Sequence, residues 1–283
     1  MNLTDLTRAT IASPSDLLTW AGHLEGLNAR QGPMLFRGQA EPHANLNPTL
    51  ARATQAGAHE VAVMLERRLI KNFRTHYCEL DSLPSNMPTT EAVARQTDIE
   101  ILSLMQHYEV PSRLLDWSES IWVAAYFACA SSPKADAELW FFDSSLLDYS
   151  DLGVSTAAAQ ERLAAAIGKK PGEYIERLGM PLLTLIAPLP NARLLAQKGR
   201  LTASDNATVD HAGLLWLLAT RRQGRNHPGN YLGRHLIKGD RKKDILQFLA
   251  EEKGISAKVL FPDMVGLGRF LRWEFEALRT TMY

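Results

Sequence analysis

The sequence contains little cysteine and no long apolar run. Its two cysteines, Cys78 and Cys129, each lie in an apolar segment with helical spacing. Two isolated thiols form neither a disulfide framework nor a metal cluster, so we expect small buried thiols in a reducing compartment. No apolar stretch approaches the length of about eighteen residues that crosses a bilayer, and the first residues lack a basic-then-apolar signal pattern. The default expectation is a cytoplasmic protein with no membrane partner.

A net charge is also missing, because 31 Lys and Arg residues balance 31 Asp and Glu residues. Attraction of a whole molecule to nucleic acid normally needs an excess of basic residues, so such a contact must come from a local patch. The candidate patch is the segment 221–243, where eight basic residues accompany one aspartate. Such a run is usually a solvated surface. The alternative is a macromolecular acceptor, protein or nucleic acid, that binds near this segment.

Several catalytic signatures are absent as well. The chain contains no Walker A loop, no G-x-G-x-x-G fingerprint and no H-E-x-x-H motif. A G-x-S-x-G nucleophile elbow is missing too, and the eight histidines form no metal-like pair. We therefore expect no metal site.

The residues that are present predict one globular domain over residues 1–283. Hydrophobic residues make up 46% of the chain, which is enough for a sizeable core. Helical and strand-like patterns alternate without an internal repeat or a linker, which predicts a mixed α/β (α+β) fold. Helices are predicted at residues 13–30, 58–80, 99–108, 121–128, 214–218 and 242–251, and strands at residues 34–36, 113–116, 138–143, 182–187, 232–237 and 259–261.

An arginine followed by a glycine stands at the end of the first predicted strand. Glycine lets the backbone approach a ligand closely, and a guanidinium group binds phosphate through two parallel hydrogen bonds. Arg37 and Gly38 are therefore candidates for a phosphate or ribose-phosphate site. The alternative is a turn glycine beside a surface arginine.

The segment 106–118 is the densest group of functional side chains. Arg113 and Asp116 bracket two leucines, and a strand would send them to opposite faces unless it bends; they could also form a structural ion pair. Trp117 is either the wall of a pocket for a flat ligand or part of the core. His107 lies on an apolar helix, where a structural histidine is commoner than a catalyst.

In order along the chain, these motifs resemble the FRG domain family. That family is named for an aromatic-Arg-Gly motif, which is matched at residues 36–39. A segment L-x-P-[ST]-L-x-R is matched at 46–52, and Q-H-Y-x-[LV]-P-[ST]-R-L-L-D-W-[ST] is matched at 106–118. The elements N-x-R-x-x-x-Q-x-G and F-P-D-x-x-G-L are matched at 191–199 and 261–267. The matches lie between residues 34 and 273, and the thirteen-residue central motif is the most specific of them.

A second similarity is to the ADP-ribosyltransferase superfamily, and it implies that the sheet of this chain is split into small β-sheets with flanking helices. Its members begin their NAD-binding sheet with an aromatic-Arg-Gly or His-Gly motif, as at residues 36–38. Their second motif is a strand ending in Ser-Thr-Ser before an apolar helix, which is similar to residues 116–128. Their third motif carries a glutamate, but here Arg193 stands near that place and would oppose a developing positive charge.

This resemblance implies a protein that binds NAD as a substrate and transfers ADP-ribose to a macromolecule, as a bacterial toxin or phage-defence effector does. It implies that Arg37 holds phosphate or ribose, and that Asp116 orients an arginine or stabilises the cation. The implied catalytic residues are Arg37, Asp116, Ser118 and Gln197, and the implied NAD-binding residues are Phe36, Arg37, Gly38, His107, Arg113, Trp117 and Arg193.

The enzymatic hypothesis requires Arg37 and Arg113 to converge on one cleft. Two alternatives remain open. One is a nucleotide-binding or nucleic-acid-binding module without turnover, and the other is a protein-interaction domain of a toxin or defence system.

Overall fold

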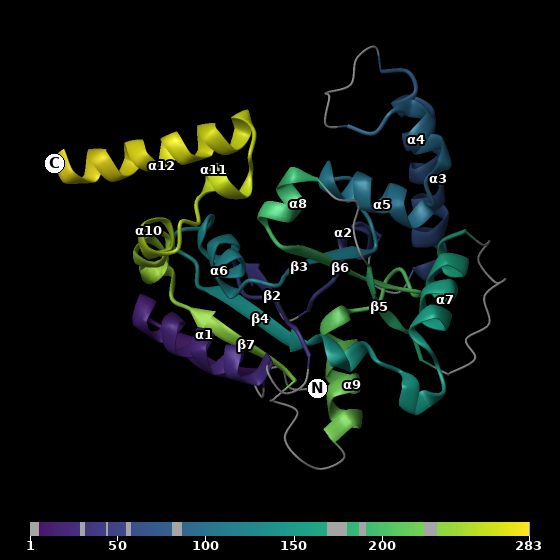
Figure 1. Cartoon of the computed structure of the whole chain (residues 1–283), viewed down its shortest axis with the longest axis horizontal. Coiled ribbons are helices and arrows are strands. Elements are labelled where there is room, and N and C mark those ends of the chain that lie inside the picture. Colours follow the sequence, from purple (N-terminus) through teal and green to yellow (C-terminus); the bar gives the residue numbers. More distant parts are fainter. Residues whose placement is uncertain are drawn as a thin grey trace.

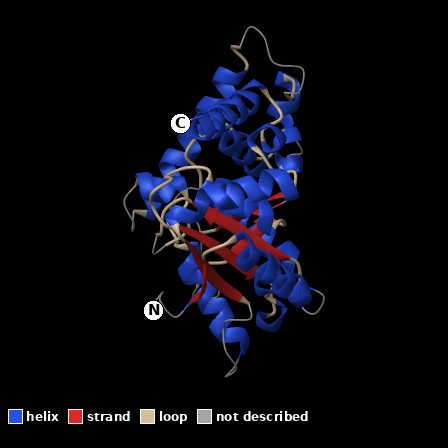
Figure 2. Cartoon of the chain, turned by 90° about the vertical axis from the view of Figure 1, so that its left-hand side faces the viewer, coloured by secondary structure: helices blue, strands red, loops and turns tan. Residues whose placement is uncertain are grey.

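A computed structural model describes residues 6–28, 32–43, 45–54, 58–80, 87–168, 180–186, 191–223 and 231–282. Their centre is one mixed sheet of seven strands in the order β1-β7-β4-β2-β3-β6-β5, with helices on both faces (Figures 1 and 2). Only the pairing of β1 with β7 is parallel. The strands are β1 (Thr7–Ile11), β2 (Met34–Gln39), β3 (Leu114–Ser118), β4 (Ala137–Asp143), β5 (Leu183–Ile186), β6 (Gly199–Ser204) and β7 (Leu232–Ile237).

The helices alternate with these strands along the chain, which confirms the mixed α/β class. Their bounds are α1 (Pro14–Asn28), α2 (Thr49–Ala53), α3 (His59–Tyr77), α4 (Thr90–Arg95), α5 (Asp98–His107), α6 (Ile121–Cys129), α7 (Thr156–Gly168), α8 (Ala192–Ala196), α9 (His211–Gln223), α10 (Lys242–Glu252), α11 (Ala257–Leu260) and α12 (Met264–Met282). In the described part of the chain, no helix is long and apolar enough to span a membrane.

Two layers of core cover the half of the sheet that contains β2 and β4. Because side chains alternate along a strand, Met34 and Phe36 point to one face and pack against α1, α6 and α10. Leu35 points to the other face and packs in a cluster that includes α9. A third cluster joins β6 to α5 and α7. This alternation determines which side chains of β2 pack in the core and which can line a pocket.

The sheet has a weak seam between β2 and β3. These strands share one residue pair, Phe36 with Ser118, whereas β2 and β4 pair along all six residues of β2. On the other side of the seam, β3 pairs with β6 along all five of its residues. The expectation of two separate small sheets is therefore wrong for the described strands, which form one sheet with a single connection at its centre.

Three local predictions are also corrected. The strand predicted at 259–261 is instead α11, because the N–H groups of Leu260 and Phe261 bond the carbonyls of Ser256 and Ala257. The predicted strands omit β1 and β6, and β6 carries few large apolar side chains that would have marked it. Cys129 is buried, as expected, and burial raises the pKa of its thiol to about 12, but Cys78 is exposed.

Candidate functional site

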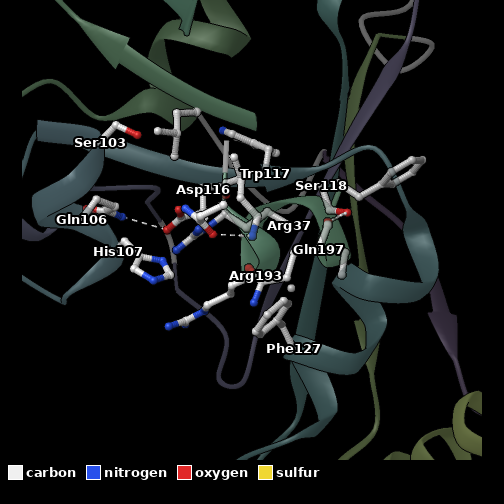
Figure 3. A pocket seen from close by; sticks show the side chains of 16 residues that line it. Arg37, Ser103, Gln106, His107, Asp116, Trp117, Ser118, Phe127, Arg193 and Gln197 are labelled. Carbon is white, nitrogen blue, oxygen red and sulfur yellow. Dashed lines mark hydrogen bonds between the residues drawn. The ribbon is translucent and has the colours of Figure 1, made fainter. Parts of the chain in front are cut away.

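A cavity of about 290 Å³ lies at the seam of the sheet. Side chains reach it from β2, β3, α5, α6 and the segment 191–197, so residues far apart in sequence share one wall (Figure 3). Phe36 and Ser118, the one position at which the described strands β2 and β3 are paired in register, both line it. The pocket is therefore a consequence of the parting of these two strands.

Arg37 is the central cation of the pocket. Its Nη1 donates to the backbone carbonyl of Asp116 at 2.8 Å. Its Nε is buried and has no hydrogen-bond partner among the described residues. Burial lowers the pKa of Arg37, and the negative charge of Asp116 opposes that shift. Since guanidinium remains protonated in proteins, the arrangement offers a charged donor to an anion.

Gly38 has a packing role that the sequence did not reveal. A Cβ atom at this position would lie 1.9 Å from the carbonyl oxygen of Ala124 and 2.5 Å from the amide nitrogen of Ala128. The glycine therefore lets α6 approach β2 closely. This approach brings Phe127 of α6 into the pocket wall, so Gly38 shapes the site through the helix and needs no ligand contact to explain it.

Asp116 is the only carboxylate that lines this pocket within the described part of the chain. Its Oδ2 accepts a hydrogen bond from Gln106 Nε2 at 2.8 Å, and its side chain is exposed to the cavity (Figure 3). Gln106 Oε1 in turn accepts from the hydroxyl of Ser112 at 2.6 Å. Gln106 was part of the central motif but was not among the predicted site residues. Its signal was its position at the head of that motif.

Arg193 and His107 complete the polar lining. Arg193 is the second residue of α8. Its guanidinium lies over the ring of Phe261, 4.5 Å from the centroid. Burial lowers the pKa of Arg193. Burial, and then the charge of Arg193, lower the pKa of His107, so this imidazole is neutral at pH 7. The pocket thus holds two arginines, one neutral histidine and one carboxylate.

Arg113 lies outside the pocket, and the prediction that it meets Arg37 in one cleft is wrong. Its side chain is fully buried, and its Nε donates to the two carboxylate oxygens of Glu66 at 3.0 and 2.8 Å. Its Nη1 donates to the carbonyl of Ser204. The ion pair considered between Arg113 and Asp116 is therefore absent as well. The missed signal was Glu66, a carboxylate at the spacing of the buried face of α3.

Trp117 lines the pocket, but its ring belongs mainly to the core. The side chain is 3% exposed, its Nε1 donates to Thr202 Oγ1 at 2.9 Å, and its ring packs edge-on against Phe142. Trp117 therefore belongs to the buried side of the pocket and does not flank an open ligand site, as was predicted. The core reading of Trp117, which was the alternative, describes this better.

Ser118 and Gln197 line the pocket with polar groups that are already engaged. Ser118 Oγ donates to the carbonyl of Gln197 at 2.7 Å and accepts from the amide of Ser120. Gln197 Nε2 donates to the carbonyl of Leu260 at 3.1 Å. These bonds attach β3 to the end of α8, and α8 to α11. Both residues therefore fix the pocket wall.

Several described residues of the basic segment 221–243 have partners within the protein. Arg221 lies 3.8 Å from a carboxylate oxygen of Asp151, and Lys238 bonds Asp136 at 2.9 Å. Arg234 pairs with Glu138, while Lys242 is buried and donates to three backbone carbonyls. Residues 224–230 of this segment lie outside the described residues. None of the described residues of the segment lines the pocket.

Fold and site together define a mixed α/β protein whose pocket, lined by two arginines and one carboxylate, opens where two central strands part. Residues 32–137 match the model of the FRG domain, so this segment of the chain is similar to that family. The matched segment contains Arg37, Gln106 and Asp116, whereas Arg193 lies beyond it. No curated protein and no solved structure matches the chain.

Proposed function

We propose that the pocket at the seam binds NAD and that the protein is an ADP-ribosyltransferase-like enzyme. The observation that carries this proposal is the guanidinium of Arg37, which lines the cavity and makes one hydrogen bond among the described residues, from Nη1 to the carbonyl of Asp116. In this proposal a phosphate oxygen of the ligand accepts from the guanidinium at the cavity. The requirement that Arg113 share this cleft with Arg37 is not met, because Arg113 is buried against Glu66. In this proposal Arg193, which lines the same cavity, supplies the second positive charge in its place.

The size of the pocket suits one half of a dinucleotide. Its volume of about 290 Å³ lies at the lower end of the range of about 300 to 1,000 Å³ that small-ligand pockets span. The nicotinamide mononucleotide half fits inside the cavity in this proposal, and the adenylate half lies across its rim. The arginines are then close to the pyrophosphate that joins the two halves.

Transfer of ADP-ribose breaks the bond between the ribose and nicotinamide, and nicotinamide leaves with the electron pair. Positive charge develops on the sugar before a nucleophile of the acceptor forms the new bond and loses its proton. A carboxylate stabilises such charge, and Asp116 is the carboxylate that lines the pocket. The acceptor in this proposal is a macromolecule, protein or nucleic acid, as for a bacterial toxin or phage-defence effector.

A second candidate function is the binding of NAD or a related nucleotide without turnover. The observation that favours it is Arg193, whose charge lies at the cavity and opposes a cationic transition state. Both candidates share the anion contact at Arg37. They differ in whether nicotinamide is released.

Titration calorimetry with NAD and mass spectrometry of a cell extract incubated with labelled NAD test the proposal. We expect Arg37→Ala to weaken NAD binding by roughly tenfold to a hundredfold, the effect of losing a hydrogen bond to a charged group. Arg68→Ala is the matched control, because Arg68 is an exposed arginine of α3 outside the pocket.

The possible results separate the two candidates. Label transfer or nicotinamide release that Arg37→Ala abolishes supports the enzyme. Binding without either product supports the binding module. Absence of NAD binding by the wild-type protein would rule out both.

A further inference from the structure

A chain of hydrogen bonds runs from the buried backbone of β3 to the carboxylate in the pocket. The amide of Leu114 donates to Ser112 Oγ at 3.1 Å. The hydroxyl oxygen accepts this bond, and the hydroxyl proton is donated to Gln106 Oε1 at 2.6 Å. Ser112 is fully buried, so no solvent competes for its hydroxyl group. The direction of each bond follows from the donors that are present.

The direction of the bond from Ser112 determines the orientation of the side-chain amide of Gln106. Because Oε1 must face the hydroxyl of Ser112, the Nε2 group must face Asp116, where it donates to Oδ2 at 2.8 Å (Figure 3). A flipped amide would place two acceptors, Oε1 and Oδ2, against each other. The Asp116 carboxylate is thereby held from one side as a hydrogen-bond acceptor.

Ser112 is itself anchored by a second motif of the chain. Its amide donates to Thr49 Oγ1 at 3.0 Å, and its carbonyl accepts from Thr49 Oγ1 at 3.3 Å. The amide of Leu50 donates to the same carbonyl at 3.0 Å. The motif at residues 46–52 therefore has a structural role, because Thr49 and Leu50 hold the loop before β3 in place.

The remaining oxygen of Asp116 is open. Arg37 holds the backbone carbonyl of Asp116, and Gln106 holds Oδ2. Within the described part of the chain, no hydrogen bond reaches Oδ1. Since the side chain is exposed to the cavity, Oδ1 is the atom that a ligand can contact.

We propose that Gln106, oriented by Ser112, is a positioning residue that aims Oδ1 of Asp116 at a ribose hydroxyl of the bound ligand. This inference rests on the proposed binding of NAD and names the sugar contact within that site. A ligand hydroxyl donates to Oδ1, while the arginines bind the phosphates.

Substitution of Gln106 separates this role from a purely structural one. Gln106→Glu keeps the volume and the oxygen that accepts from Ser112, but it replaces the donor to Asp116 with a second carboxylate oxygen. A residue that only accepts from Ser112 would tolerate the change. Gln247→Glu is the matched control, because Gln247 Nε2 also donates to a carboxylate, Glu251 Oε1 at 3.0 Å, on the exposed surface of α10.

Ser112 offers an independent pair of variants. Ser112→Ala removes the hydroxyl that orients Gln106, whereas Ser112→Thr keeps a hydroxyl at this position. The positioning role predicts that the alanine variant resembles Gln106→Glu and that the threonine variant resembles the wild-type protein.

The experiment measures the affinity of each variant for NAD and for an NAD analogue that lacks the hydroxyl groups of the nicotinamide ribose. We expect the wild-type protein to prefer NAD by roughly tenfold or more, as for a hydrogen bond to a charged group. Gln106→Glu and Ser112→Ala should lose this preference, and Ser112→Thr and Gln247→Glu should retain it. General damage to the fold would weaken both ligands in parallel and leave their ratio unchanged.

Two results would overturn the inference, and they are distinguishable. A wild-type protein that binds neither ligand rejects the proposed function together with the inference. A wild-type protein that prefers NAD, with a preference unchanged in Gln106→Glu, rejects the positioning role alone.

Discussion

Arg37 and Arg113 are residues of one type in two different environments. Arg113 is fully enclosed and satisfied by Glu66 and backbone carbonyls. Arg37 is partly exposed in a cavity and keeps one buried donor open. A buried charge needs a complete set of partners, and a ligand-binding charge needs an incomplete one. This difference favours a structural role for Arg113 and leaves Arg37 as the candidate for ligand binding.

We expect Glu66→Gln to lower the free energy of unfolding by about 3 to 5 kcal/mol, because it leaves the enclosed charge of Arg113 without a counter-ion. Urea unfolding measures the change. Glu119→Gln is the control, since the pair of Glu119 with Arg200 is about 40% exposed and such pairs contribute about 1 kcal/mol or less. Equal effects of the two substitutions would contradict the role of the enclosed pair.

His211 is a second buried residue with a defined protonation state. Its Nδ1 lies 3.1 Å from Thr202 Oγ1, which also accepts from the indole of Trp117. Burial, and then the charge of Arg37, lower the pKa of His211 to about 3. The imidazole is therefore neutral beneath the pocket at pH 7.

This pKa shift makes stability depend on pH in a known direction. Unfolded His211 titrates near a pKa of about 6.5, so between that value and about 3 the unfolded state binds more protons than the folded state. The stabilisation is complete above the unfolded pKa and is lost as the pH falls, by up to about 1.4 kcal/mol per pH unit from this group. His211→Gln should flatten the pH dependence of urea unfolding over this window. An identical slope in the variant would contradict the assignment.

At the scale of elements, β3 shows how one strand serves two faces. Leu115 and Trp117 join the core cluster on one face, while Asp116 and Ser118 line the pocket. Trp117 also lines the pocket, but its ring is buried in the core. The period of two along a strand predicts this division from the sequence alone. What the period does not predict is that the β2 and β3 neighbours part beyond one residue pair.

The close contact of β2 with α6 yields a prediction about glycine. Gly38→Ala forces a Cβ against the Ala124 carbonyl, 1.9 Å away, so either the helix or the strand must shift. We expect a loss of about 1 to 3 kcal/mol, as for overpacked cores, and a distorted pocket. Thermal unfolding measures the loss.

Gly22→Ala, in helix α1, is the contrasting variant. Nothing lies within 4 Å of the Cβ position of Gly22 in α1, and alanine is favoured over glycine inside helices by about 1 kcal/mol. We therefore expect Gly22→Ala to be neutral or stabilising. Destabilisation by both variants would show that glycine acts through chain flexibility and that close packing is not the reason.

At the scale of the whole molecule, the sheet is two paired regions that meet at Phe36 and Ser118. The pocket lies at this meeting point, so a ligand there contacts both regions. The C-terminal helix α12 projects away from this body (Figure 1) and exposes several apolar side chains, among them Met264, Leu271 and Phe275. The sheet, and not this helix, organises the site.

Ligand binding across the seam should stabilise the whole molecule and protect the seam locally. At a free NAD concentration of about 100 times the Kd, the free energy of unfolding should rise by about 2.7 kcal/mol. Hydrogen–deuterium exchange should slow in β2 and β3, whereas the outer pair of β1 and β7 should change less. At the same NAD concentration Arg37→Ala should reduce both effects, with the stabilisation falling to about 0.4 to 1.4 kcal/mol. Protection spread evenly over all strands would contradict binding at the seam.

The sequence by itself determined the class of fold, the similarity to the FRG domain and the segments from which Arg37 and Asp116 reach the pocket. Alternating patterns of helix and strand are local properties of the sequence. The motifs at 36–39 and 106–118 contain Arg37 and Asp116, which both line the pocket. Gln106 was within the central motif, but its role depends on the hydroxyl of Ser112 and so was not visible in the spacing.

Only the tertiary structure decided which arginines share the pocket. Arg113 is three residues before Asp116 in sequence, so the alternation along an extended chain places the two side chains on opposite faces. Arg113 points into the core, where Glu66 of α3 neutralises its charge. Arg193 is distant in sequence and reaches the cavity because α8 packs at the end of β6. Spacing along a chain fixes the face of an element on which a side chain lies, whereas the partner across that face is set by how the elements pack.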